Sequence, residues 1–203
     1  MPRKTKRADS DESQSKQMKA AEPVGDWRET LYYWHGPVST DEAGVTTWQG
    51  SWIASADGLP SPAEFEASSN AFKLMSNDFL VRDGVPLEDT CPFGRSGYFN
   101  GYYKLDNDGT GLRDYSDIEH RIVIKDHTAG WALVGARGTA DFGEFISAGR
   151  LVFPHGTSPA CLTLARRYLA DNDPRVHLSA WAAVRQIDSN LEGRDMPWKQ
   201  LAM

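Results

Sequence analysis

Residues 117–125 read DIEHRIVIK, and this stretch carries the clearest secondary-structure signal in the chain. The isoleucines at positions 118, 122 and 124 share one face with His120, whereas the other face is mostly charged. Alternation with a period of two, together with β-branched residues, is typical of a β-strand that buries one of its faces. We therefore interpret residues 117–125 as a strand with a buried side.

Similar runs of aromatic and β-branched residues, bounded by Gly, Pro, Asn or Asp, occur along the rest of the chain. They cover residues 45–55, 64–75, 98–105, 130–138, 142–153 and 160–169. Residues 177–187 fit either a further strand or a short helix, because periodicity cannot separate the two at this length. The aromatic stretch from Trp27 to Trp34 indicates one or two helical turns that end at His35-Gly36-Pro37.

Seven or eight strands joined mostly by short connections predict an all-β fold. Sequential strands usually pair with their neighbours, and a meander that closes on itself leaves no exposed edge. The first prediction is therefore an antiparallel up-and-down barrel, and a two-sheet β-sandwich is the alternative. We expect the barrel domain to span residues 26–190 and to be followed by a C-terminal tail over residues 191–203.

Residues 1–25 differ from the rest of the chain in composition. They are polar and contain no aromatic residue, so they cannot bury enough apolar area to offset the entropy lost on ordering. We expect a disordered arm. Its basic cluster of Arg3, Lys4, Lys6 and Arg7 fits either a nuclear-import signal or a simply solvated chain end.

Charge and cysteine content narrow the class of protein. The 203 residues have a formal net charge of −6; the arm carries +2, so the remainder carries −8. An acidic domain is a poor surface for nucleic acid, and no run of about 18 apolar residues is present to cross a membrane. With only Cys91 and Cys161 and no secretory signal, we expect a cytoplasmic or nuclear protein.

Residues 106–117 resemble an EF-hand calcium loop. The oxygen ligands would be Asp106, Asp108, Thr110 and Asp114, with Asp117 in the last position. The last ligand is normally a Glu, and the flanks here are expected strands rather than helices. A polar hairpin loop has the same composition, so calcium is the only cofactor that the sequence indicates and a turn is the simpler interpretation.

Gly50-Ser51-Trp52 matches the Gly-x-Trp signature of the calycin superfamily, the lipocalin-like barrels, and residues 135–145 are similar to hairpins of other barrel domains. The resemblance covers roughly residues 45–170 as a pattern. It implies that an arginine of the last strand, Arg166 or Arg167, packs across Trp52. In some intracellular members a buried His ligates haem, a role that the resemblance would give to His120. The simpler interpretation of a lone His on an apolar strand face is a hydrogen-bonded core residue. Unlike the secreted members, the chain has neither a signal peptide nor a disulfide pattern.

The sequence does not indicate an enzyme, and no catalytic residue is assigned. Gly-x-Ser-x-Gly, His-Glu-x-x-His and phosphate-binding glycine motifs are missing from the sequence. The many aromatic residues predict either a ligand cavity or a solid core, because eight strands are just wide enough for both. An interior ligand site would comprise Trp52, Phe99, Tyr103, His120, Trp131, Phe145 and Arg166.

Three tryptophans outside the expected strands, Trp27, Trp34 and Trp198, are candidates for a protein interface. The preferred function is therefore a non-catalytic β-barrel interaction module, such as a subunit of a larger assembly, whose partner is a protein. The alternatives are an intracellular carrier of a small apolar ligand and a calcium-binding β domain.

Overall fold

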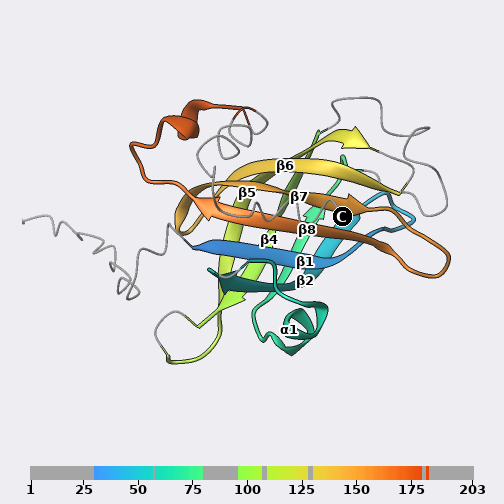
Figure 1. Cartoon of the computed structure of the whole chain (residues 1–203), viewed down its shortest axis with the longest axis horizontal. Helices are drawn as coiled ribbons and strands as arrows, with labels where there is room; N and C mark the ends of the chain where they lie inside the picture. Colours follow the sequence, from blue (N-terminus) through green and yellow to red (C-terminus); the bar gives the residue numbers. More distant parts are fainter. Residues whose placement is uncertain are drawn as a thin grey trace, which may run out of the picture.

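Eight antiparallel strands form a closed barrel in the order of the chain (Figure 1). The computed structural model describes residues 30–56, 58–79, 96–106, 109–127, 130–179 and 182. The strands are β1 Leu31–Thr40, β2 Thr46–Ser55, β3 Ala71–Ser76, β4 Ser96–Leu105, β5 Arg113–His127, β6 Trp131–Ala140, β7 Gly143–Val152 and β8 Ala160–Tyr168. The predicted up-and-down barrel is confirmed. The β-sandwich alternative is wrong, because β1 pairs with β8 and closes the sheet.

The strand that completes the barrel is the first one in the chain, not residues 177–187. Helical turns were predicted up to Trp34, but residues 31–34 begin β1, and Pro37 lies within the strand opposite Cys161. The Gly36-Pro37 pair resembles a strand terminator, which conceals the alternation of Tyr32, Trp34 and Val38. The described residues 177–179 contain no strand, and a 3₁₀ helix, η1 Pro174–His177, ends there.

Only the second half of the predicted strand over residues 64–75 is a strand. A short helix, α1 Pro62–Ala67, precedes β3. Ser61 begins the helix with a capping box, in which its backbone N–H donates to the Glu64 carboxylate at 2.7 Å and its side chain accepts from the Glu64 N–H. Phe65 then holds the helix on the outer wall, against Tyr33 and Ala165.

The main hydrophobic core lies inside the barrel and draws side chains from all eight strands. Strand glycines allow the wall to bend around it. A Cβ at Gly50 would lie 2.1 Å from the carbonyl oxygen of His35, and one at Gly138 would lie 1.8 Å from that of Glu119. Only glycine permits neighbouring strands to approach so closely. This close approach explains why the first residue of the Gly-x-Trp run, Gly50, is a glycine.

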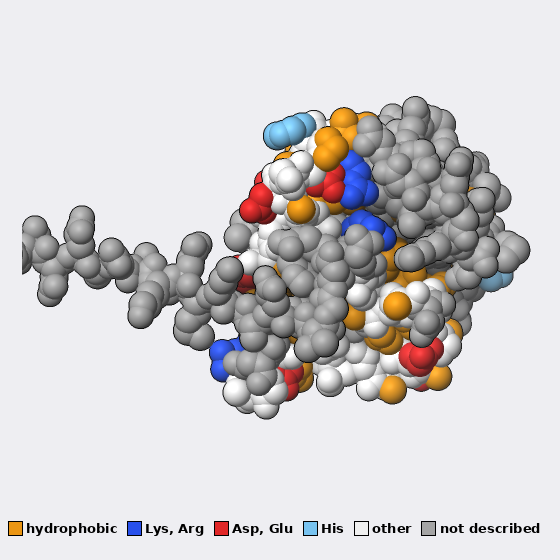
Figure 2. Space-filling model, turned by 60° about the vertical axis from the view of Figure 1, so that its left-hand side comes forward, with side chains coloured by type: hydrophobic (Ala, Val, Ile, Leu, Met, Phe, Trp, Pro, Cys, Tyr) orange, Lys and Arg blue, Asp and Glu red, His pale blue; other side chains and the backbone are white. Residues whose placement is uncertain are grey.

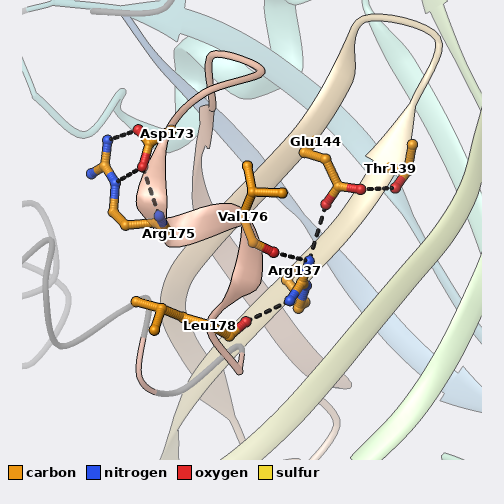
Figure 3. A network of polar contacts seen from close by, with 7 residues as sticks. All are labelled: Arg137, Thr139, Glu144, Asp173, Arg175, Val176 and Leu178. Atoms are coloured by element: carbon orange, nitrogen blue, oxygen red, sulfur yellow. Dashed lines mark hydrogen bonds and ion pairs between the residues drawn. The ribbon is translucent and has the colours of Figure 1, made fainter.

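After β8 the chain folds back onto the outer surface of β6 and β7. Arg137 of β6 donates to the carbonyl oxygens of Val176 at 2.8 Å and Leu178 at 2.5 Å, and pairs with Glu144 at 3.1 Å (Figure 3). Val176 and Leu178 of this segment pack against the buried side chains of Ile146 and Leu169. The segment is thus fastened to the outside of the wall. None of the helices in the described residues is long and apolar enough to cross a membrane.

Candidate functional site

The barrel interior contains polar side chains within its aromatic core. Arg166 of β8, His120 of β5 and Ser147 of β7 are fully buried. Arg166 and Ser147 are register partners on adjacent strands. Since alternate residues of a strand share a face, Ser147 points inwards together with Phe145. These three strands therefore bring a cation, an imidazole and a hydroxyl into the same interior.

The guanidinium of Arg166 lies between two aromatic rings. Its Cζ is 3.9 Å from the ring centroid of Trp34 and 3.7 Å from that of Phe145. Its Nη1 donates to the hydroxyl of Tyr168 at 3.3 Å. A desolvated cation–π contact contributes about 2 kcal/mol, so the two rings offset part of the cost of burying the charge.

The arginine contact differs from the one that the calycin resemblance implies. Arg166 packs across Trp34 rather than Trp52, and Arg167 lies partly exposed on the outer wall. The Nε1 of Trp52 instead donates to the carbonyl oxygen of Lys104 at 3.1 Å. The prediction that Trp34 belongs to a protein interface is also wrong, because this side chain is only 2% exposed inside the barrel.

The contact between His120 and Arg166 determines which nitrogen of the imidazole carries its proton. His120 Nδ1 lies 3.4 Å from Arg166 Nη2. A guanidinium nitrogen can only donate, so Nδ1 accepts and the proton of the neutral ring is assigned to Nε2. His120 therefore presents an N–H at Nε2 and, through that atom, acts as a hydrogen-bond donor rather than as a general base.

Two indole N–H groups complete the set. The Nε1 atoms of Trp34 and Trp48 and the hydroxyl of Ser147 have no hydrogen-bond partner among the residues that the structure describes. The Trp48 ring centroid lies 6.3 Å from that of Trp34 and 5.8 Å from that of His120. Buried N–H groups usually have a partner, so these are positions where a ligand or a water is expected. We call Trp34, Trp48, His120, Ser147 and Arg166 the donor cluster.

Four aromatic side chains, of which Tyr168 is buried and the others are half-buried, lie between the donor cluster and the end of the barrel where β1 begins and β8 ends. The Tyr168 ring, next to Arg166, contacts Tyr32 at 5.4 Å and Phe142 at 6.3 Å between centroids, and Phe142 contacts Tyr115 at 5.2 Å. Burial and the nearby Tyr168 raise the pKa of Tyr32 to about 12, so its hydroxyl keeps its proton. We call these four residues the aromatic rim.

Figure 2 turns the left-hand end of Figure 1, where β8 finishes, towards the viewer. Among the coloured side chains on the face that it shows, basic, acidic and hydrophobic ones lie next to one another.

Six of the seven side chains predicted for an interior ligand site do face the interior. They are Trp52, Phe99, Tyr103, His120, Phe145 and Arg166, and none is more than 5% exposed. Trp131 does not, because β6 turns Ala132, Val134 and Ala136 inwards. The ring of Trp131 lies on the outer wall, with Arg150 Cζ 4.7 Å from its centroid. The other strands turn large side chains inwards, and the small inward residues of β6 pack opposite them.

Seven of the nine side chains in the donor cluster and aromatic rim were not among those predicted for the interior ligand site: Tyr32, Trp34, Trp48, Tyr115, Phe142, Ser147 and Tyr168. The alternation from Tyr32 to Val38 was the available signal for Trp34, and Gly36-Pro37 concealed it. Trp48 shares a strand face with Trp52, which was predicted. Ser147 alternates with Phe145 and Gly149, but a single serine within a strand gives no signal of its own.

Two of the predicted calcium ligands, Thr110 and Asp114, face cations. Thr110 Oγ1 accepts from Arg113 at 2.7 Å, and the Asp114 carboxylate pairs with Lys104 at 3.5 Å. Asp106 is described, whereas Asp108 and the side chain of Asp117 lie outside the description. Among the described residues, no three His, Cys, Asp or Glu side chains are close enough to hold a metal ion. Calcium binding stays a prediction.

A thiol and an imidazole meet on the outer wall, beneath α1. Cys161 Sγ lies 3.7 Å from Nε2 and 3.8 Å from Nδ1 of His35, and the same Nδ1 is 2.7 Å from Thr163 Oγ1. Burial raises the pKa of the thiol and lowers the pKa of the imidazole. Both groups are therefore neutral at pH 7, which is the opposite of an activated thiolate–imidazolium pair.

The chain matches no protein-family model, and comparisons with curated proteins and with solved structures find no match. Of the predicted interface residues, Trp27 and Trp198 lie outside the described residues. The chemistry of the donor cluster is therefore the strongest guide to function.

Proposed function

We propose that the protein is a non-catalytic carrier of a small ligand that has an apolar body and an acidic group. The observation that carries the proposal is the donor cluster, in which the fully buried guanidinium of Arg166 lies among aromatic rings. The bound acidic group would lie at Arg166, and the apolar body would contact the aromatic side chains of the barrel interior.

The chemistry of arginine favours an acid as the ligand. A guanidinium is weakly hydrated and matches the geometry of carboxylate and phosphate groups, and hydrogen bonds between charged groups are about twice as strong as neutral ones. The assigned N–H of His120 and the Tyr168 hydroxyl add donors beside it. A site of mostly apolar walls with a few convergent polar groups is typical of small-molecule binding.

Binding of an anionic aromatic fluorophore, 8-anilinonaphthalene-1-sulfonate, tests this proposal. We expect the folded wild type to bind it, and Arg166→Met to weaken binding by about tenfold, because a charge-assisted hydrogen bond contributes about 1.5–3 kcal/mol. Arg167→Met is the matched control, since it removes the neighbouring charge from the outer wall and should leave binding unchanged.

Two further measurements complete the test. Near-ultraviolet circular dichroism of each variant shows that the fluorophore reports on a folded barrel. Native mass spectrometry of the protein from its own cells is expected to show a co-purified mass of a few hundred daltons. A wild type that binds neither fluorophore nor natural ligand, or equal loss of affinity in Arg166→Met and Arg167→Met, contradicts the carrier function.

A non-catalytic interaction module is a second candidate. Three large side chains on the outer faces of β3 and β4 are 43–46% exposed: Met75, Tyr98 and Tyr102. A photo-crosslinking residue at position 102, compared with one at the exposed position 114, tests it. An adduct specific to position 102 supports the module, and the same yield at both positions contradicts it.

A further inference from the structure

The three indoles inside the barrel do not use their N–H groups in the same way. Trp52 donates to a backbone carbonyl, that of Lys104. The N–H groups of Trp34 and Trp48 are at least as deeply buried but have no partner within the described part of the chain. A buried donor that the fold leaves without an acceptor is expected to meet one from outside the chain.

Trp34 lies next to Arg166, where the acidic group would bind, and Trp48 lies further along the barrel. The Trp34 ring stacks directly on the guanidinium of Arg166, with 3.9 Å between Cζ and the ring centroid. Trp48 pairs with Val38, four residues further along β1 than Trp34, and its ring lies 5.8 Å from that of His120. A ligand with its acid at Arg166 would therefore pass Trp34 and extend towards Trp48.

We propose that the ligand is an oxo acid, that is, an acid with a neutral carbonyl oxygen further along its body, and that Trp34 and Trp48 recognise this carbonyl; this inference rests on the proposed carrier function. An indole N–H can only donate and carries no charge, so its suitable partner in an apolar site is a neutral acceptor. A carbonyl oxygen has two lone pairs and accepts from one or both indoles.

This arrangement discriminates between acids. A site built to hydrogen-bond one group rejects an analogue that lacks it, because the buried donors are then left unsatisfied. A plain hydrocarbon acid would bind at Arg166 yet leave the indole N–H groups in an apolar environment. The oxo acid satisfies both requirements, so Trp34 and Trp48 are specificity-determining residues in this proposal.

Matched pairs of acids test the proposal by isothermal titration calorimetry on the full chain. The probes are 4-phenylbutanoate and 4-oxo-4-phenylbutanoate, with the 5-phenylpentanoate and 5-oxo-5-phenylpentanoate pair to vary the spacing. We expect the wild type to bind an oxo acid about tenfold more tightly than its plain partner, as one net hydrogen bond implies. Trp48→Phe or Trp34→Phe is expected to abolish this preference while the plain acid still binds.

Trp52→Phe is the matched control, because its N–H already has a backbone acceptor, and it should keep the preference. Equal affinity for both members of each pair in the wild type overturns the oxo-acid proposal and leaves the carrier function intact. A preference that persists in both Trp34→Phe and Trp48→Phe also overturns it, and means that a buried water satisfies these donors. Failure of all four acids to bind overturns the carrier function together with this inference.

Discussion

Burying an arginine side chain costs more free energy than burying an apolar side chain of similar volume. Moving its charge out of water costs several kcal/mol, and an apolar side chain of similar volume is often neutral or stabilising in its place. Arg166 nevertheless lies at 0% exposure between Trp34 and Phe145. The cost is understandable if the charge serves binding, since functional sites commonly reduce stability.

His35 predicts a pH dependence of stability. Burial lowers the pKa of its imidazole below the ordinary value of 6.5, so the folded protein binds fewer protons at this site than the unfolded chain does. Stability therefore rises with pH in this window. We expect the contribution of His35 to the melting temperature to be complete above pH 6.5. The melting temperature should fall as the pH is lowered from there towards the folded-state pKa.

Thermal melts between pH 8 and pH 5 measure this dependence. His35→Gln should flatten the slope just below pH 6.5 relative to the wild type. An unchanged slope in His35→Gln would show that other groups control stability in this window.

Among the structural elements, the segment after β8 depends most clearly on a single side chain. Arg137 holds the carbonyl oxygens of Val176 and Leu178 and pairs with Glu144. The Glu144 carboxylate also accepts from the Thr139 hydroxyl at 3.0 Å, which orients it towards the arginine. The contacts in Figure 3 thus connect η1 to the outer wall at one point.

Replacing Arg137 by Met is therefore expected to detach this segment from the wall. The free energy of unfolding should fall by about 1–3 kcal/mol, because two carbonyl acceptors lose their donor. Protease cleavage after Tyr168 should become faster at the same time. Urea titration and limited proteolysis measure the two effects. Arg121→Met is the control, because Arg121 is exposed and lies over the exposed ring of Tyr98, so this substitution should change stability by less than about 0.5 kcal/mol.

The barrel as a unit has one core and no free edge strand. The core cluster takes residues from every strand, and β1 pairs with both β2 and β8. A local failure of pairing therefore exposes side chains shared by the whole ring. Unfolding of such a structure is expected to be cooperative, as in most small single domains.

This cooperativity can be tested with Gly50→Ala. The added Cβ would lie 2.1 Å from the carbonyl oxygen of His35, a backbone atom that cannot move away cheaply. We expect a loss of about 1–3 kcal/mol, as for other overpacked sites, without a change in the urea m-value. The transitions followed by tryptophan fluorescence and by far-ultraviolet circular dichroism should coincide in both wild type and variant. Separate transitions would mean that part of the wall unfolds by itself.

The aromatic and β-branched alternation was sufficient to predict seven strand regions and their sequential order. Alternation is a local property, because successive side chains of a strand point to opposite faces whatever the strand pairs with. For that reason β5 and most of β7 and β8 were predicted within a few residues. The first half of the predicted 64–75 strand failed for an equally local reason, since the Ser61 capping box begins a helix there.

Barrel closure and the composition of the donor cluster depend on contacts between residues far apart in the chain. His35 and Thr163, for example, are hydrogen-bonded although they are 128 positions apart. Alternation shows that two faces exist, but only the pairing of β1 with β8 decides that Trp34 lies against Arg166. In the same way, only the packing of the whole interior leaves Trp131 on the outer wall. The amino-acid sequence thus determined most of the strands and their order through local geometry. The interior site was decided by tertiary structure, because the packing of all eight strands selects which side chains lie inside the barrel.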